Sequence, residues 1–515
     1  MLLQEYLINA ARQYPEKEAI IQAGTRVTYG QLLDGATAVA GWLLEEKLQH
    51  GDRVAILSDN PPEYIMAYFG ILMAGGIAVP LNTQTSDRTL EYLFNHCGIS
   101  FLLTQASYLK YLHVLCDSLP TLKAAAISGL KDDGNNTLPF QCINLNIIFS
   151  ASKKASHLNA ATEATDADIA QITYTSGTTG QPKGVMLRHS NLIANTNSII
   201  QYLHLNQDER HMVVLPFFYS FGNSILLSHF AVKASMVVHQ NLVYPNVALD
   251  LMIKEKSTGF SGVPSTYAIL LHRSALSSYA FPHLRYCTQA GGAMSPKLAQ
   301  MLKKVLPNVD IYIMYGQTEA CARLSYLEPE DLIRKAGSIG KAIPDVRLQV
   351  LNQDGNPVQP GETGEIVAQG ENIMAGYWED PEATKMVLKK DGLWTGDLAR
   401  VDEDGYIYVV SRKSDMIKSG AHRIAPKEIE DIIIEYEAVH EVAVLGIDDE
   451  MLGEAIKACI VLKDGKLCTK KEIQTYCHRK LPAYKVPHHI VFCEQLPKTS
   501  SGKIKKNELK ERKDN

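Results

Sequence analysis

Apolar runs alternate with helix-spaced segments in the first part of the chain, and this alternation restricts the fold more than any other feature. Strands are expected at residues 53–57, 77–80 and 100–104. Helices are expected at residues 4–14, 28–46 and 89–96, with another that opens at Pro61 or Pro62 and closes at Gly75 and Gly76. Elements in this order form sheets of parallel strands covered by helices. The pattern therefore predicts layered α/β structure.

Several later strands end directly in small or polar residues. These strand-then-loop units cover residues 212–222, 260–265, 288–293 and 311–319, and helices are expected at residues 191–200 and 224–231. In open α/β sheets, ligands bind beyond such strand ends. Residues 129–163 are polar and irregular, and we expect them to form loose surface.

Residues 174–185 form the loop that most resembles a phosphate site. The segment holds three glycines, four Ser or Thr hydroxyls and Lys183. Glycines allow backbone N–H groups to converge on one point, and the hydroxyls and the cation add further interactions with an anion. The spacing of Gly177 and Gly180 does not match a Walker loop. A flexible surface turn is the alternative, and the density of donors makes a polyphosphate site the better interpretation.

The pattern changes near Ser338. Residues 346–351, 364–368 and 405–410 alternate apolar and polar side chains between turns, which is typical of antiparallel hairpins. Residues 411–423 form a polar, basic connector, and a small α/β unit follows, with helices at 426–436 and 470–480 and strands at 439–446, 455–462 and 490–493. A chain of 515 residues is too long for one core. The second domain is expected to hold about one hundred residues.

Composition excludes several classes of protein. The net charge of −5 gives no reason to expect nucleic acid as a partner. The nine cysteines form no CxxC pair and read as reduced thiols of a cytoplasmic protein. The N-terminus has no secretory pattern, the C-terminus has no peroxisomal address, and no apolar run is long enough to span a membrane.

Four further segments could carry chemistry, although each has an ordinary structural alternative. Residues 315–319 place a hydroxyl beside a carboxylate, which suits Mg²⁺ near phosphate, although the segment taken alone is more typical of a capped helix start. Residues 394–397 end in an Asp after a tight turn, which suits a ribose diol or a plain Asp turn. Residues 411–418 could be a solvated linker, and residues 497–504 could be a surface turn with a lysine.

Taken together and in order, these segments resemble the signatures of the adenylate-forming superfamily. Residues 174–185, 315–319, 395–397, 412–418 with 424–426, and 497–504 carry the resemblance, which extends over nearly the whole chain. Within the superfamily the chain is most similar to stand-alone acyl-CoA synthetases. The resemblance implies a large N-terminal AMP-binding domain (1–412) of layered α/β subdomains with a small β-barrel-like part, and a small, mobile C-terminal α/β domain (413–515).

The resemblance also implies which residues hold the nucleotide. The β- and γ-phosphates are expected on residues Thr175, Ser176, Gly177, Thr178, Thr179 and Gly180, with Lys183 close by. Adenine is expected against Gly291, Gly292, Ala293 and Tyr315, and Gly316 is a further residue expected to bind ATP or AMP. Thr318 would bind the α-phosphate, Glu319 the Mg²⁺, and Asp397 the ribose hydroxyls with help from Arg412.

In such enzymes the small domain rotates between two half-reactions. Lys503 is expected to bridge the acyl carboxylate and the α-phosphate in the first half-reaction. The hinge falls at Ser414, where many relatives have Asp or Lys, and Lys418, Gly420 and Ala421 would line the thiol tunnel. Ala421 stands where relatives often have a second glycine.

The expected acyl pocket consists of Tyr219, Ser220, Asn223, Val263, Gly291 and Met314. Amino-acid activators carry an Asp where Ser220 stands, and a buried ammonium without a carboxylate is costly. The neighbouring side chains are mostly apolar, so a fatty or aryl acid fits best.

The predicted function is ATP- and Mg²⁺-dependent activation of a carboxylic acid to an acyl-adenylate, followed by transfer to the thiol of coenzyme A. The alternative acceptor is the phosphopantetheine of a carrier protein acting in trans. A non-catalytic nucleotide-binding protein is a different class, and the presence of Lys503 and Glu319 argues against it. We expect a monomer or homodimer with no nucleic-acid partner.

Overall fold

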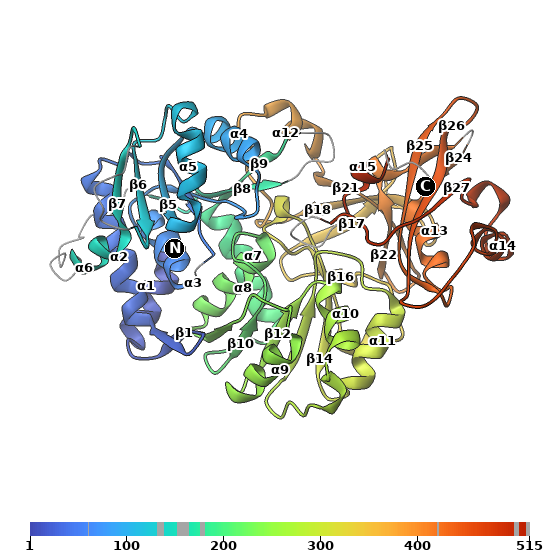
Figure 1. Cartoon of the computed structure of the whole chain (residues 1–515), viewed down its shortest axis with the longest axis horizontal. Helices are drawn as coiled ribbons and strands as arrows, with labels where there is room; N and C mark the ends of the chain where they lie inside the picture. Colours follow the sequence, from blue (N-terminus) through green and yellow to red (C-terminus); the bar gives the residue numbers. More distant parts are fainter. Residues whose placement is uncertain are drawn as a thin grey trace.

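The computed structural model describes residues 1–59, 61–130, 138–151, 164–175, 181–419, 422–498 and 504–510. These residues form four sheets. In Figure 1 the first part of the chain is blue and lies at the left, and the C-terminal part is red and lies at the right. No helix in the described ranges is long and apolar enough to cross a membrane.

The first sheet has eight strands and includes, near one edge, β8 and β9, the two strands that flank the predicted phosphate loop. Its strand order is β19 (Gly376–Tyr377), β9 (Lys183–Arg188), β8 (Ile169–Thr175), β4 (Ile77–Pro80), β3 (Arg53–Leu57), β5 (Ile99–Gln105), β6 (Ala124–Ser128) and β7 (Gln141–Asn144). The strands from β8 to β7 pair in parallel, as predicted. Part of the prediction for residues 129–163 is wrong, since β7 and α6 (Leu145–Ala151) are regular elements.

A nine-stranded sheet lies below it in Figure 1. Its order is β16 (Lys341–Ala342), β15 (Ser325–Leu327), β14 (Asp310–Tyr315), β13 (Tyr286–Gln289), β12 (Gly259–Gly262), β10 (Arg210–Val213), β11 (Ser235–Val238), β1 (Glu18–Gln22) and β2 (Thr25–Thr28). The strands from β14 to β1 are parallel, so the carboxyl ends of β12, β13 and β14 meet at one edge.

Helices form three layers around these two sheets. The shared core contains buried side chains from both sheets, such as Val54 and Val213. It is packed by α1 (Gln4–Gln13), α2 (Tyr29–Glu45), α3 (Pro61–Met73), α7 (His189–Leu203) and α8 (Ser220–Ala231). The outer faces are covered by α4 (Asp87–Cys97) and α5 (Leu109–Leu115) on one sheet and by α9 (Pro245–Lys254), α10 (Pro264–Arg273) and α11 (Pro296–Val305) on the other.

Two helix starts illustrate what local sequence decides. Thr28 caps α2 with a capping box that includes Gln31, which confirms the predicted start. Helix α8 begins at Ser220, four residues before the predicted start at 224. The early start places Ser220 in the first turn of the helix, where its hydroxyl reaches Thr318 beyond the end of β14.

The third sheet is antiparallel, as predicted for residues 346–410. Its order is β17 (Arg347–Leu351), β18 (Thr363–Gln369), β21 (Gly392–Val401) and β20 (Leu388–Lys389), with β22 (Ile407–Arg412) paired to β21 and α12 (Pro381–Val387) before β20. Among the described strands, no pairing closes this sheet, so the expected barrel-like part is an open five-stranded sheet.

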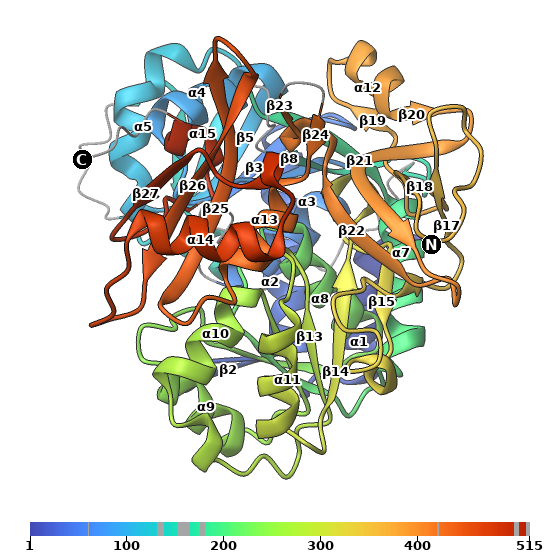
Figure 2. The same ribbon diagram turned by 90° about the vertical axis from the view of Figure 1, so that its right-hand side faces the viewer.

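The fourth sheet forms the C-terminal unit, which faces the viewer in Figure 2. Its order is β24 (His422–Ile424), β23 (Ile417–Ser419), β26 (Gly453–Leu462) and β25 (Val439–Asp449), with β27 (His489–Phe492) parallel to β26. The helices of this unit are α13 (Pro426–Ile433), α14 (Lys470–Lys480) and α15 (Lys506–Lys510). The interpretation of 411–423 as a connector is wrong in part, because Ile417 is buried in β23.

The chain passes from the third sheet to the fourth between Arg412 and Ile417, through the short helix η7 (Lys413–Asp415). The domain boundary after residue 412 and the hinge at Ser414 stay predictions.

Candidate active site

Asp397 lies in a bulge of β21, where the predicted tight turn does not exist. The register of β21 against β18 shifts at this point, and Gly396 has a φ of 77° that places it in the left-handed region. Tyr315 Oη donates a hydrogen bond of 2.6 Å to Asp397 Oδ2, and Arg412 Nε donates one of 2.9 Å to Oδ1. The structure thus brings together three of the predicted nucleotide-binding residues.

Burial and charge set the protonation of this group. Burial, followed by the charge of Asp397, raises the pKa of Tyr315 well above its ordinary value. Burial lowers the pKa of Arg412, but the charges of Asp397, Tyr315 and Glu319 outweigh it, so the net pKa is raised. Tyr315 therefore stays a hydrogen-bond donor, and Arg412 stays a cation.

Thr318 and Glu319 begin η5 (Thr318–Ala320), a single turn directly after β14. Ser220 Oγ donates a hydrogen bond of 2.9 Å to Thr318 Oγ1. The alternative role as helix cap is not seen, because the cap position is Gln317 and no side chain bonds there. Neither predicted side chain is therefore used as a cap of this turn.

Glu319 fits a magnesium ligand. Tyr377 Oη donates to one of its oxygens, Oε1, at 2.9 Å, which orients the carboxylate and leaves the other oxygen for a cation. Burial, then the charge of Glu319, raises the pKa of Tyr377 far above its ordinary value and keeps it a donor. The described residues contain no cluster of three or more His, Cys, Asp or Glu side chains that could hold a metal. One carboxylate suffices when phosphate and water supply the other ligands.

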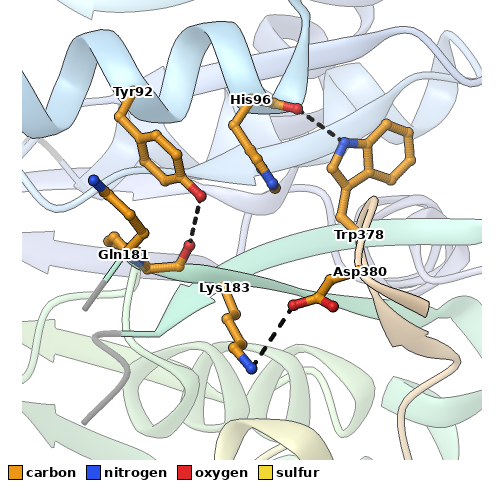
Figure 3. Close-up of a pocket in the computed structure, with 7 residues that line it drawn as sticks. Tyr92, His96, Gln181, Lys183, Trp378 and Asp380 are labelled. Carbon is orange, nitrogen blue, oxygen red and sulfur yellow. Dashed lines mark hydrogen bonds and ion pairs between the residues drawn. The ribbon is translucent and has the colours of Figure 1, made fainter. Parts of the chain in front are cut away.

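Lys183 is the first residue of β9, so the predicted loop ends in a strand. Its Nζ lies 3.7 Å from Asp380 Oδ2 and 5.1 Å from the ring centre of Tyr377. Lys183 and Asp380 line a pocket of about 190 Å³, drawn in Figure 3, together with Tyr92, His96, Gln181, Pro182 and Trp378. The carboxylate partner shows that Lys183 is anchored beside the loop.

Sequence reasoning missed Tyr377 and Asp380. They lie on and after β19, which pairs with β9 although nearly two hundred residues separate the two strands. Asp380 also caps α12 by accepting from Ala383 N. A Gly-Tyr-Trp run before a capping Asp was the only signal, and by itself it points to no particular site.

The predicted acyl-pocket residues come from the start of α8 and the ends of three parallel strands. A Cβ on Gly291 would stand 3.2 Å from Val263 Cγ1, so these two loops touch. Met314 is buried and accepts a hydrogen bond of 3.0 Å from Tyr202 Oη at its sulfur. Asn223 Nδ2 donates to Gln171 Oε1 at 3.0 Å.

Two residues that the sequence did not single out contact predicted residues in this region. Asn82 Nδ2 donates to Tyr219 Oη at 3.4 Å. Gln289 Nε2 donates to the Gly292 carbonyl oxygen at 2.8 Å and fixes the loop that continues to Ala293.

Several predicted residues lie outside the described ranges: Ser176, Gly177, Thr178, Thr179, Gly180, Gly420, Ala421 and Lys503. Their roles stay predictions. At the predicted hinge, Ser414 Oγ donates to Asp415 Oδ1 at 3.1 Å, and the neighbouring Lys413 lies 3.0 Å from Glu365 Oε2. In the predicted thiol tunnel, Lys418 N donates to Glu454 Oε2 at 2.6 Å.

Comparison with known families agrees with this geometry. The model of the AMP-binding enzymes matches residues 7–378, and that of the AMP-binding enzyme C-terminal domain matches residues 428–503. The first match alone spans well over half of the chain, and the chain therefore belongs to the AMP-binding enzyme family. This finding confirms the resemblance to adenylate-forming enzymes.

Individual relatives are similar over their full lengths. Long-chain-fatty-acid–CoA ligase of Bacillus subtilis (strain 168) is 31% identical, covering 99% of this chain and 94% of the relative. Feruloyl-CoA synthase of Amycolatopsis sp is 33% identical, covering 99% of both. The o-succinylbenzoate CoA synthetase of Bacillus subtilis, solved with its acyl-adenylate intermediate, is 28% identical with a TM-score of 0.85, covering 99% and 98%. The same synthetase has also been solved with ATP and a magnesium ion, with a TM-score of 0.84 at 29% identity, covering 98% and 99%.

Proposed function

We propose that this protein activates a fatty or aryl carboxylic acid with ATP and Mg²⁺ and transfers the acyl group to coenzyme A. The observation that carries the proposal is the pair of hydrogen bonds that Tyr315 and Arg412 donate to the Asp397 carboxylate. Thr318 and Glu319 follow Tyr315 within four residues. A carboxylate fixed in this way can accept the two hydroxyls of a ribose. The named relatives, which are CoA ligases and synthases, support the reaction class.

In the first half-reaction, the acid's carboxylate attacks the α-phosphorus and pyrophosphate leaves. Thr318 binds the α-phosphate, and Ser220 holds its hydroxyl in place. Mg²⁺ at Glu319 neutralises phosphate charge when it is bound. Lys503 is assigned, on the family resemblance, to bridge the two anionic reactants, whose approach requires a positive charge between them.

In the second half-reaction, the thiol attacks the acyl carbon and AMP leaves. We infer that the C-terminal unit, residues 413–515, turns about Ser414 between the two steps. Lys413, next to the proposed pivot, forms an ion pair with Glu365 of β18. This ion pair connects the proposed hinge to the third sheet. Lys418 would then line the path of the thiol.

Coenzyme A is the acceptor that we favour over a carrier protein. A basic C-terminal surface would favour an acidic carrier protein, but Lys505 and Lys506 of this segment already pair with Glu508 and Glu430. We place the enzyme in the cytoplasm, where its nine cysteines, all free, would stay reduced.

Pyrophosphate release over a panel of fatty, aryl and amino acids tests the reaction, with AMP and thioester measured in parallel. We expect fatty or aryl acids to release pyrophosphate and form a thioester with coenzyme A, and α-amino acids to fail because Ser220 offers no negative charge. Release of ADP and phosphate, or no nucleotide cleavage with any acid, would overturn the proposal. Higher thioester yield with a holo-carrier protein would reassign the acceptor.

A further inference from the structure

Arg323 is a buried cation that the proposed reaction does not use. It lies between η5 and β15 and is only 3% exposed. Among the described residues no Asp or Glu pairs with it, and Tyr202 is the group that favours its charge. Burial nevertheless lowers the pKa of the guanidinium below its ordinary value. A desolvated charge without a counter-ion is costly, so this position calls for a partner.

The guanidinium has a buried donor without a partner, although Tyr202 also interacts with its side chain. Nη1 donates to the neighbouring Ala322 carbonyl oxygen at 3.1 Å, whereas Nε is buried and has no hydrogen-bond partner. The Cζ atom stands 4.2 Å from the ring centre of Phe221, and the ring face compensates only part of the lost hydration. An arginine carries five N–H donors in a planar fork that matches a carboxylate.

The same side chain is linked to the proposed acyl pocket through the ring of Phe221. Phe221 follows Ser220 in the first turn of α8, and it packs in one apolar cluster with Met314 and Tyr202. Helices α7 and α8, which carry Tyr202 and Phe221, lie side by side in Figure 1. The cation therefore stacks on the ring of Phe221, whose cluster includes Met314, one of the predicted pocket residues.

The backbone holds Arg323 firmly in this place. Asn372 Nδ2 and Asn195 Nδ2 both donate to its carbonyl oxygen, at 2.9 Å and 3.1 Å. A Cβ on Gly316 would collide with the Ala322 carbonyl oxygen, so the segment of Thr318 and the segment of Arg323 are packed backbone to backbone. The main chain at Arg323 is therefore fixed by neighbouring segments, which gives the side chain a defined starting point.

We propose that Arg323 is a specificity residue that binds a second carboxylate on the acid substrate, at the end away from the reacting carboxylate. This inference rests on the proposed function and narrows its substrate class to dicarboxylic acids, aliphatic or aryl. A plain hydrocarbon tail would leave the guanidinium desolvated and unpaired, whereas a carboxylate would complete its hydrogen bonds.

The test compares matched acids on the full-length enzyme. Saturated monoacids and diacids with four to ten carbons are paired by carbon number, and kcat/KM is measured for pyrophosphate release. We expect wild-type enzyme to prefer the diacid by about tenfold to 100-fold at the best length, as hydrogen bonds to a charged group imply. Arg323→Met should lose this preference, and Arg323→Lys should restore part of it. A wild-type preference for monoacids at every length, or an unchanged ratio in Arg323→Met, would overturn the inference.

Two controls separate folding and function from recognition. Arg347→Met makes the same exchange at an exposed position of β17 and should keep the wild-type ratio. Calorimetric binding of the diacid in the presence of a non-hydrolysable ATP analogue needs no turnover. If no acid is activated, the proposed function fails. Binding of the diacid to the wild-type enzyme but not to Arg323→Met would still support carboxylate binding by Arg323. Equal binding to both proteins would refute it. If Arg323→Met does not fold, the wild-type ratio and Arg323→Lys decide.

Discussion

Tyr315 and Asp397 are joined by a hydrogen bond of 2.6 Å, although 82 residues separate them in the chain. Tyr315 ends β14 of the nine-stranded sheet, and Asp397 lies in the bulge of β21 in the third sheet. The bond therefore fixes two parts of the molecule against each other at the point where we place the nucleoside. Arg412, at the end of β22, holds the other oxygen of the same carboxylate.

Replacing Asp397 with Asn should weaken ATP binding. The amide keeps one acceptor but loses the charge that Arg412 faces and the second acceptor for the ribose, so we expect the Kd for ATP to rise about tenfold to 100-fold. Titration calorimetry measures the change. Asp354→Asn, on an exposed turn, is the matched control and should bind ATP normally. Unchanged ATP affinity in Asp397→Asn would remove Asp397 from the ribose site.

Replacing Glu319 with Gln should change the metal requirement more than the fold. The amide oxygen can still accept from Tyr377, so the local structure should persist, but a neutral ligand binds Mg²⁺ weakly. We expect the Mg²⁺ concentration for half-maximal pyrophosphate release to rise about tenfold, roughly the worth of one charged hydrogen-bonding ligand. A titration with Mg²⁺ at saturating ATP checks it. The same Mg²⁺ dependence as wild type would argue against Glu319 as a ligand.

Replacing Lys503 with Ala should separate the two half-reactions. Adenylate formation should fall by about 100-fold or more, because the positive charge between the reactants is lost. Thioester formation from supplied acyl-AMP should be largely spared. The two steps are measured separately, with Lys505→Ala as a neighbouring control. Equal loss of both half-reactions would contradict the assigned role.

His189 should make the fold sensitive to acid. Its Nδ1 accepts the Leu3 N–H at 3.2 Å, and burial, opposed by Asp168 and Asp166, lowers its pKa to about 4. The unfolded chain, with a His pKa of about 6.5, binds more protons between pH 6.5 and pH 4, so stability falls as the pH drops through this range. At pH 5 the loss from this one group is about 2 kcal/mol.

Urea unfolding at pH 7 and pH 5 measures this loss. His189→Asn keeps an acceptor near the position of Nδ1 without a titrating ring, and we expect it to lose less stability than wild type between the two pH values. Buried His211 and His229, whose pKa values burial also lowers, remain in both proteins and contribute to the loss that His189→Asn keeps. Equal losses in the two proteins would show that His189 does not titrate in this way.

The sequence predicted those elements whose ends are set by residues close to them in the chain. The bounds of β3, β4 and α14 agree with the predictions, because apolar runs end at polar residues or glycines and Thr469 caps α14. The bulge at Asp397 was not predictable in this way, because it depends on the pairing of β21 with β18 and β22. The grouping of Tyr377 with Glu319 depends on the equally distant pairing of β19 with β9.

Arg323 can be noticed in the sequence, but the sequence does not show what this arginine contacts. It is the only charged residue between Ala320 and Leu327, which marks it as unusual in a buried segment. Its position against Phe221 comes from the packing of α8, which begins earlier than the sequence predicts.

Oxygen transfer from the acid to AMP tests the central claim most directly. The enzyme is given ATP, Mg²⁺, coenzyme A and a substrate acid with ¹⁸O in its carboxylate, and the products are analysed by mass spectrometry. Attack of the carboxylate on the α-phosphorus predicts one ¹⁸O atom in AMP and none in pyrophosphate. Unlabelled AMP, or ¹⁸O in inorganic phosphate together with ADP, would contradict the account.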